Sequence, residues 1–100
     1  MTEVVWTLAA SVDYQKLFNQ FEEHRAGAGA RFEEELEARL ALLAIFPHMG
    51  RVYEAPFRRL LVFGHEHGLF YTVEARGIIV HALLHNRQDP DSIRRRLLGE

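Results

Sequence analysis

The segment PFRRLLVFGHEHGLFYTVEARGIIVHALLHNRQD, residues 56–89, decides the fold. It contains three runs rich in β-branched and aromatic residues, separated by the glycine-bearing breaks HEHG at 65–68 and RG at 76–77. Glycine supplies the backbone angles that tight turns need, and connections this short join antiparallel neighbours. We therefore predict a three-stranded antiparallel meander.

Both faces of this meander are largely apolar. Side chains alternate along a strand, so the first run divides into Arg58, Leu60 and Val62 against Arg59, Leu61 and Phe63. The last run divides into Ile78, Val80, Ala82 and Leu84 against Ile79, His81, Leu83, His85 and Arg87. A small antiparallel sheet normally buries one face and leaves the other in water. We therefore expect the second face to meet something outside the chain, such as a partner protein.

An amphipathic helix hairpin precedes the meander. The first helix begins near Thr7 or Ser11, and its apolar stripe consists of Tyr14, Leu17, Phe18 and Phe21. The second runs over residues 30–45, has a stripe of Phe32, Leu36, Leu40 and Leu43, and ends before Pro47. The break at 25–29 has the length of a helix-hairpin loop, so we expect both stripes to pack on one face of the sheet.

Three shorter segments complete the predicted fold. Residues 3–7 form a strand too short to stand alone, which must pair with the meander, and residues 51–54 are an extended arm or an extra strand. Asp89 and Pro90 are a strong helix start, and the helix that follows has Ile93 and Leu97 on one side. We predict a single α+β domain over residues 1–100, in the order β-α-α-β-β-β, with an antiparallel sheet on a helix hairpin and a short C-terminal helix.

Composition places the chain among ordinary globular proteins. It has 100 residues, 48% of them apolar and 26% charged, which suits one domain. The absence of cysteine excludes disulfides and thiol chemistry. The N-terminus lacks the basic residues of a signal peptide, and the longest apolar run, at 40–46, is far short of a membrane span. We expect a cytoplasmic protein that does not bind membranes.

The charge is distributed unevenly along the chain. Residues 1–50 contain eight acidic and four basic residues, whereas residues 51–100 contain six acidic residues and eight arginines. Guanidinium groups suit two-point contact with carboxylate or phosphate, so the second half is the better candidate for an anionic partner. A mildly basic half without functional meaning is the alternative interpretation.

Motifs for metal, nucleotide and acyl-transfer chemistry are absent. His65 and His67 lie in a turn without helical H-E-x-x-H spacing, and His81 and His85 lie about 13 Å apart by strand rise, too far to share one ion. The sequence has neither a phosphate-binding loop nor a serine in a nucleophile elbow. We expect no metal and no cofactor.

One polar set on the meander remains. Arg58 or Arg59 lies on the first strand, and His85 with Arg87 ends the last. Phosphodiester cleavage needs an arginine for developing charge and a histidine for proton transfer. The same side chains often do no more than solvate the rim of a sheet, so both interpretations stay open.

The whole pattern resembles the RelE/ParE superfamily of bacterial type II toxins. The resemblance covers nearly the whole chain and depends on VVWTLAA at 4–10, FPHMGR at 46–51, PFRRLLV at 56–62, GLFYTV at 68–73 and ALLHNRQDP at 82–90. It implies a toxin held inactive by a cognate antitoxin that has a DNA-binding head and an acidic, amphipathic C-terminal tail wrapping the toxin. Such a tail would account for the apolar second face and the basic half, and the toxin would contact DNA only through its antitoxin.

Two branches of this superfamily imply different targets. RelE-like members cleave messenger RNA on the ribosome, and ParE-like members inhibit DNA gyrase by binding it. Arg59 matches an arginine position of the nucleases, and His85 lies close to their terminal histidine. However, the meander has no lysine, no tyrosine follows Tyr71, and the chain continues into an arginine-rich helix. The resemblance therefore favours the ParE-like branch, with a target contact made by Arg58, Arg59, Arg87, Arg94, Arg95 and Arg96.

Two alternatives stay open at this point. The first is a ribosome-dependent endoribonuclease in which Arg59 orients phosphate and His85 acts as acid or base, assisted by Glu54. The second is a non-toxic, degenerate member that survives as a binding module.

Overall fold

The structure, a computed structural model, describes residues 2–99. The elements are β1 (Val4–Trp6), α1 (Leu8–His24), α2 (Ala28–Ile45), β2 (Arg51–Glu54), β3 (Phe57–Val62), β4 (His67–Glu74), β5 (Gly77–His85) and α3 (Pro90–Leu98). The predicted α+β class, the helix hairpin and the meander are confirmed. Residues 51–54, left open as a strand or an arm, form a strand.

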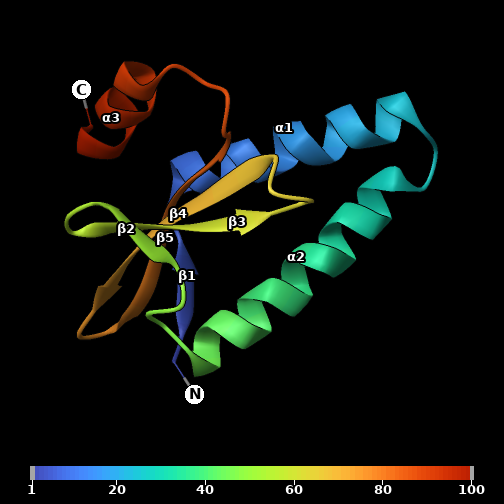
Figure 1. Cartoon of the computed structure of the whole chain (residues 1–100). Helices are drawn as coiled ribbons and strands as arrows, with labels where there is room; N and C mark the ends of the chain where they lie inside the picture. Colours follow the sequence, from blue (N-terminus) through green and yellow to red (C-terminus); the bar gives the residue numbers. More distant parts are fainter. Residues whose placement is uncertain (1, 100) are drawn as a thin grey trace.

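The five strands make one open, mixed sheet in the order β1-β5-β4-β3-β2. Strands β2 to β5 are antiparallel neighbours, whereas β1 pairs with β5 in parallel, with Val4 opposite Ile78. The prediction of an antiparallel sheet is therefore corrected at this edge. Because the hairpin and the meander separate β1 from β5 in sequence, no tight turn forces the pair to be antiparallel. In Figure 1 the α1–α2 hairpin lies on one side of the sheet, and α3 lies apart from it at the other.

Side chains of α1 and of the residue before it cap the starts of both helices. Thr7, one of the two predicted caps, precedes α1, and its Oγ1 accepts a hydrogen bond from Ala10 N at 3.1 Å. At the start of α2 the two oxygens of the Glu22 carboxylate accept from Gly27 N and Gly29 N, both at 3.0 Å. A carboxylate at a helix N-terminus satisfies amides that have no partner within the helix.

The main core lies between the helix hairpin and the sheet. The predicted stripes of both helices point into it, and Phe32 packs between Phe21 and Phe63 with ring centroids 5.1 and 4.5 Å apart. Its buried sheet residues are Leu60, Val62, Leu69, Tyr71, Ile78, Val80 and Leu83. This burial is the principal source of stability, because transfer of apolar surface from water dominates folding free energy.

The predicted alternation along β5 is wrong after Val80. Tyr71 pairs with Val80 but Phe70 pairs with Ala82, so His81 is an extra residue in β5. Such a β-bulge changes which face the following side chains occupy. As a result Leu83 lies in the core under the hairpin, and Ala82 packs on the opposite face.

The second face of the sheet is covered by the chain's own C-terminal helix. Ile93 and Leu97 of α3 are buried against Phe57, Phe70 and Ala82. The expectation that an outside protein covers this face is therefore wrong for the residues beneath α3. The sequence signals for the helix start and for its apolar side are both confirmed, but they do not specify where the helix docks.

Candidate functional site

Four of the six arginines proposed to contact a target already have partners within the chain. Arg58 lies on the hairpin side and donates to Gly50 O at 2.8 Å, which holds the loop before β2. In α3, Arg94 pairs with Glu54 at 3.0 Å and Arg96 with Asp13 at 2.6 Å. Arg95 Nη2 donates to Ser92 Oγ at 3.3 Å. These contacts fix the loop and α3, so binding a target through these side chains would compete with them.

Arg59 lies within β3 on the face away from the main core, and Arg87 follows the end of β5. The guanidinium carbon of Arg59 lies 5.1 Å from the centre of the Tyr53 ring, a cation–π contact. Arg87 is exposed and lines a hollow with His65, Glu66, His85 and Asn86. These two arginines are the members of the predicted set best placed to meet an outside molecule.

The structure places Arg59 and His85, the proposed nuclease pair, on opposite faces of the sheet. Arg59 is paired across the strands with Phe70, which packs under α3. His85 is paired with His67, whose ring contacts Phe63 at 5.7 Å on the hairpin side. Glu54, the proposed assistant, forms the ion pair with Arg94. No catalytic arrangement of Arg59 with His85 is therefore formed.

The lowered pKa of His67 predicts that stability depends on pH. His67 is 6% exposed, burial and then the neighbouring His85 lower its pKa, and within residues 2–99 its Nδ1 has no hydrogen-bond partner. Because the folded pKa lies below the unfolded one, the unfolded state gains protons first as pH falls through about 6.5, and stability is lost there.

Urea denaturation at pH 7.5 and 5.5 measures this loss. We expect a smaller loss for His67→Leu than for the wild type, with His24→Gln as the control for removing an exposed histidine. Some loss should persist in His67→Leu, because burial also lowers the pKa of His81. A loss as large in His67→Leu as in the wild type would contradict this role.

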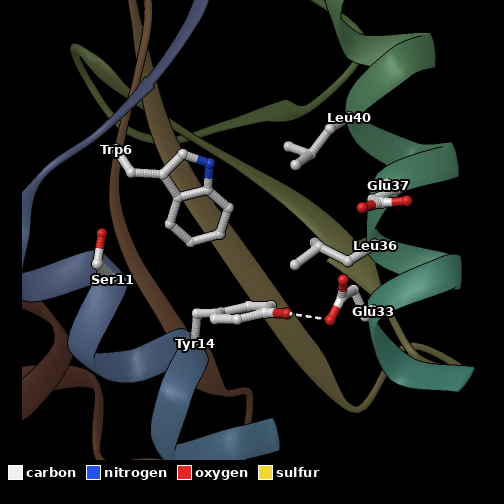
Figure 2. Close-up of a pocket in the computed structure, with 7 residues that line it drawn as sticks. All are labelled: Trp6, Ser11, Tyr14, Glu33, Leu36, Glu37 and Leu40. Atoms are coloured by element: carbon white, nitrogen blue, oxygen red, sulfur yellow. Dashed lines mark hydrogen bonds between the residues drawn. The ribbon is translucent and has the colours of Figure 1, made fainter. Parts of the chain in front are cut away.

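An apolar groove lies between β1, the start of α1 and α2. Its volume is about 260 Å³, and it is lined by Trp6, Ser11, Tyr14, Glu33, Leu36, Glu37 and Leu40. Figure 2 shows the rings of Trp6 and Tyr14 on one side, facing Leu36 and Leu40 of α2 across the groove. Tyr14 OH donates to Glu33 Oε2 at 2.8 Å, and burial with this carboxylate raises the pKa of Tyr14 to about 12. The phenol is therefore a fixed neutral donor.

The floor of the groove is apolar and one rim is acidic. Glu37 is exposed on the α2 side, and Leu8, three residues before Ser11, is 83% exposed. Such a surface suits the apolar side of a partner helix that also presents a cation. Sequence reasoning missed the groove, because it treated Leu36 and Leu40 only as core residues and did not say which strand of the meander β1 pairs with.

Two general observations bear on the class of site. Within residues 2–99 no three histidine, aspartate or glutamate side chains are grouped so as to hold a metal ion. Over the same residues, no helix has both the length and the apolarity needed to cross a bilayer.

A helix hairpin on one face of an open five-stranded sheet, with a groove beside its first strand, defines a small α+β domain with one candidate binding groove there. The chain belongs to the family described as "ParE toxin of type II toxin-antitoxin system, parDE", which its sequence matches over residues 4–90. This confirms membership of the RelE/ParE superfamily and the favoured ParE-like branch. Nearly all of α3 follows the matched region.

Solved structures include one with a similar fold. A chain from "Chromosomal ParDE TA system from P. aeruginosa" superimposes with a TM-score of 0.73 and 16% sequence identity, covering 85% of this chain and 96% of the other. No sequence among the curated proteins is similar enough to this chain to count as a relative.

Proposed function

We propose that this chain, a ParE toxin, is neutralised by a cognate antitoxin that binds it directly, and that the free toxin arrests growth by inhibiting DNA gyrase in the cytoplasm. The observation that carries the proposal is the match to the ParE toxin family over residues 4–90. The similar solved structure is titled as a ParDE toxin-antitoxin system, which supports an antitoxin partner here. The opposed positions of Arg59 and His85 argue against the ribonuclease alternative.

The gyrase contact is proposed to centre on Arg59 and Arg87. Arg59 lies on β3 and Arg87 follows β5, and neither forms an ion pair within residues 2–99. The other four arginines also belong to the proposed surface: Arg58, Arg94, Arg95 and Arg96. We expect them to contribute less to gyrase binding, because each already has an internal partner. Arginine is among the residues most enriched at binding hot spots, so losing one is expected to cost affinity.

A supercoiling assay with purified gyrase tests this surface. We expect the full chain to inhibit supercoiling, and the double variant Arg59→Ala/Arg87→Ala to require at least about tenfold more protein, equivalent to ~1.4 kcal/mol. Arg76→Ala, an exposed arginine in the β4–β5 turn, is the matched control and should inhibit like the wild type. Supercoiling unaffected by excess wild-type protein would refute the gyrase proposal. Transcript cleavage after induced expression would support the nuclease alternative, and growth without arrest would indicate a non-toxic binding module.

The groove beside β1 is the proposed antitoxin site. Its apolar lining can bury the anchors of an amphipathic antitoxin helix, and Glu37 at the rim can meet a lysine or arginine of that helix. An acidic antitoxin tail suits the surface around Arg59 and Arg87 instead, so a tail that wraps the toxin would need cationic residues where it crosses the groove.

Charge reversal at the rim tests this placement. We expect Glu37→Arg to weaken antitoxin binding about tenfold, because it replaces an attraction with repulsion at the edge of a desolvated contact. Glu34→Arg on the same helix is the matched control, since Glu34 is exposed but does not line the groove. Calorimetric titration of toxin with antitoxin measures both variants. Equal affinities for Glu37→Arg and Glu34→Arg would place the antitoxin elsewhere.

A further inference from the structure

A hollow lined by arginines lies at the open edge of β3. Its volume is about 470 Å³, and it is lined by Arg39, Met49, Gly50, Arg51, Arg59, Leu60, Leu61 and His65. The three arginines come from α2, β2 and β3, and His65 comes from the turn after β3. No carboxylate is among these lining residues, so the hollow is a concentrated positive site.

Within residues 2–99, the arginines of this hollow form no ion pair. The ion pairs described above join Arg94 to Glu54 and Arg96 to Asp13, and within residues 2–99 neither involves Arg39, Arg51 or Arg59. Moreover, Arg51 and Arg59 are direct cross-strand partners, with their side chains on the same face. Like charges placed directly opposite each other destabilise a sheet, and a bound anion would remove that cost.

Arg59 is held in place before any ligand arrives. A Cβ on Gly68 would lie 2.9 Å from Arg59 Cδ, so the absence of a side chain there allows the aliphatic part of Arg59 to lie against β4. Tyr53 supports the guanidinium group with its ring. Arg39 is held as well, because its Nη2 donates to Leu61 O at 3.1 Å. Positioned donors bind a ligand with less loss of side-chain entropy.

The wall formed by residues 49–51 is also fixed. The buried Tyr71 hydroxyl accepts from Gly50 N at 2.9 Å and donates to Pro47 O at 2.7 Å. Arg58 Nη1 donates to Gly50 O at 2.8 Å from the other side. The loop that presents Arg51 is therefore tied to the core, and the hollow is a built feature of the fold.

We propose that this hollow binds a phosphate group carried by a nucleotide or by a nucleic-acid strand. A terminal phosphate offers three oxygens and up to two charges to guanidinium groups, whereas a carboxylate offers two oxygens and one charge. The hollow falls within the range of small-ligand pockets, about 300–1,000 Å³, which leaves room for the group attached to the phosphate. The proposal is for binding, and His85 of the proposed nuclease pair has no part in it, because His85 lies on the other face of the sheet.

Titration of the full chain with three probes tests the proposal without gyrase, so its result is independent of the proposed function. The probes are pyrophosphate, a single-stranded oligonucleotide with a 5′-phosphate and the same oligonucleotide without it. We expect saturable shifts of the Nε–H signals of Arg39, Arg51 and Arg59 in nuclear magnetic resonance spectra. If the phosphorylated oligonucleotide binds more tightly than the other two probes, the ligand is the end of a nucleic-acid strand. If pyrophosphate binds most tightly, the ligand is a free nucleotide or phosphate.

Variants decide whether the arginines act as a site. We expect Arg51→Gln and Arg59→Gln to weaken phosphate binding about tenfold each, because each loses charged hydrogen bonds. Arg59→Lys, which keeps the charge but not the fork, should lie between Arg59→Gln and the wild type. Arg76→Gln is the control outside the hollow and should bind normally, with melting curves confirming that all variants fold.

Three results would overturn the inference. The first is the absence of saturable phosphate binding by the folded wild-type chain. The second is a loss in Arg76→Gln as large as in Arg51→Gln, which would show non-specific attraction. The third is a glutamate-rich peptide that shifts the same arginine signals while phosphate does not, which would make the hollow a site for an acidic protein.

Discussion

A chain with Gly77→Ala is expected to unfold with a free energy about 3 kcal/mol lower than the wild type. Gly77 has φ of +138°, a conformation that L side chains rarely adopt, and an added Cβ would lie 2.6 Å from Glu3 O. That oxygen belongs to the backbone just before β1 and accepts from Ile78 N at 2.8 Å. Since no flexible side chain can give way, relief of the clash requires β1 to move from β5.

Gly64→Ala is the matched control for this substitution. Gly64 also has positive φ, +65°, but nothing lies within 4 Å of its added Cβ. Gly64→Ala should therefore lower the free energy of unfolding only by the conformational strain of the alanine, about 1 kcal/mol. Urea denaturation followed by circular dichroism compares the two variants. Equal costs would mean that the contact between Gly77 and the chain before β1 does not constrain the fold.

The same pair of variants links the sheet to the groove. β1 carries Trp6 into the groove lining, and its three residues are attached to the sheet only through β5. Displacing β1 should therefore weaken antitoxin binding in Gly77→Ala beyond any effect of Gly64→Ala. Affinity measured at a temperature where both variants are folded separates this effect from global unfolding.

The parts of the fold that sequence predicted are those with local signals. Glycines at the turns located the meander, apolar stripes located both helices, and Asp89 with Pro90 located the start of α3. Each signal depends on residues within a few positions of one another, where backbone preference and periodicity act directly.

The parts that sequence did not predict depend on distant contacts. The parallel pairing of β1 follows from packing across about 70 residues, and the bulge at His81 changes the face of Leu83 without any glycine or proline to mark it. The docking of α3 on Phe70 likewise depends on tertiary contacts. Periodicity cannot supply these, because it specifies which side chains share a face but not what that face meets.

In the candidate site, too, the sequence revealed the local pattern but not the distant contacts. The arginines were recognised as a group, but the sequence did not show that Arg58 and Arg96 have internal partners while Arg59 lies open to a hollow. Arg39 is not part of the predicted apolar stripe of the second helix. It belongs to the hollow because that side of α2 lies along the edge of β3, where Arg39 contacts Leu61 O.

Arg96→Ala is expected to lower the free energy of unfolding by about 2 kcal/mol, and the melting temperature by roughly 10 °C. Arg96 donates to both oxygens of Asp13, at 3.1 and 2.6 Å, and Asp13 also accepts from Leu83 N at 3.0 Å. Asp13 is only 8% exposed, so removing its partner leaves a nearly buried carboxylate with one amide donor. The expected cost is below the full value for a buried pair because the Arg96 side chain is 28% exposed.

Arg95→Ala is the matched control on the same helix, since Arg95 is exposed and should change stability by no more than about 0.5 kcal/mol. A double-mutant cycle of Asp13→Asn with Arg96→Met isolates the coupling between the two side chains. The ion pair joins α3 to α1 across the sheet edge, so its loss should also release Ile93 and Leu97 from the second face and increase binding of a hydrophobic dye. If Arg96→Ala has the same stability and the same dye binding as Arg95→Ala, apolar contacts alone hold α3 on the sheet.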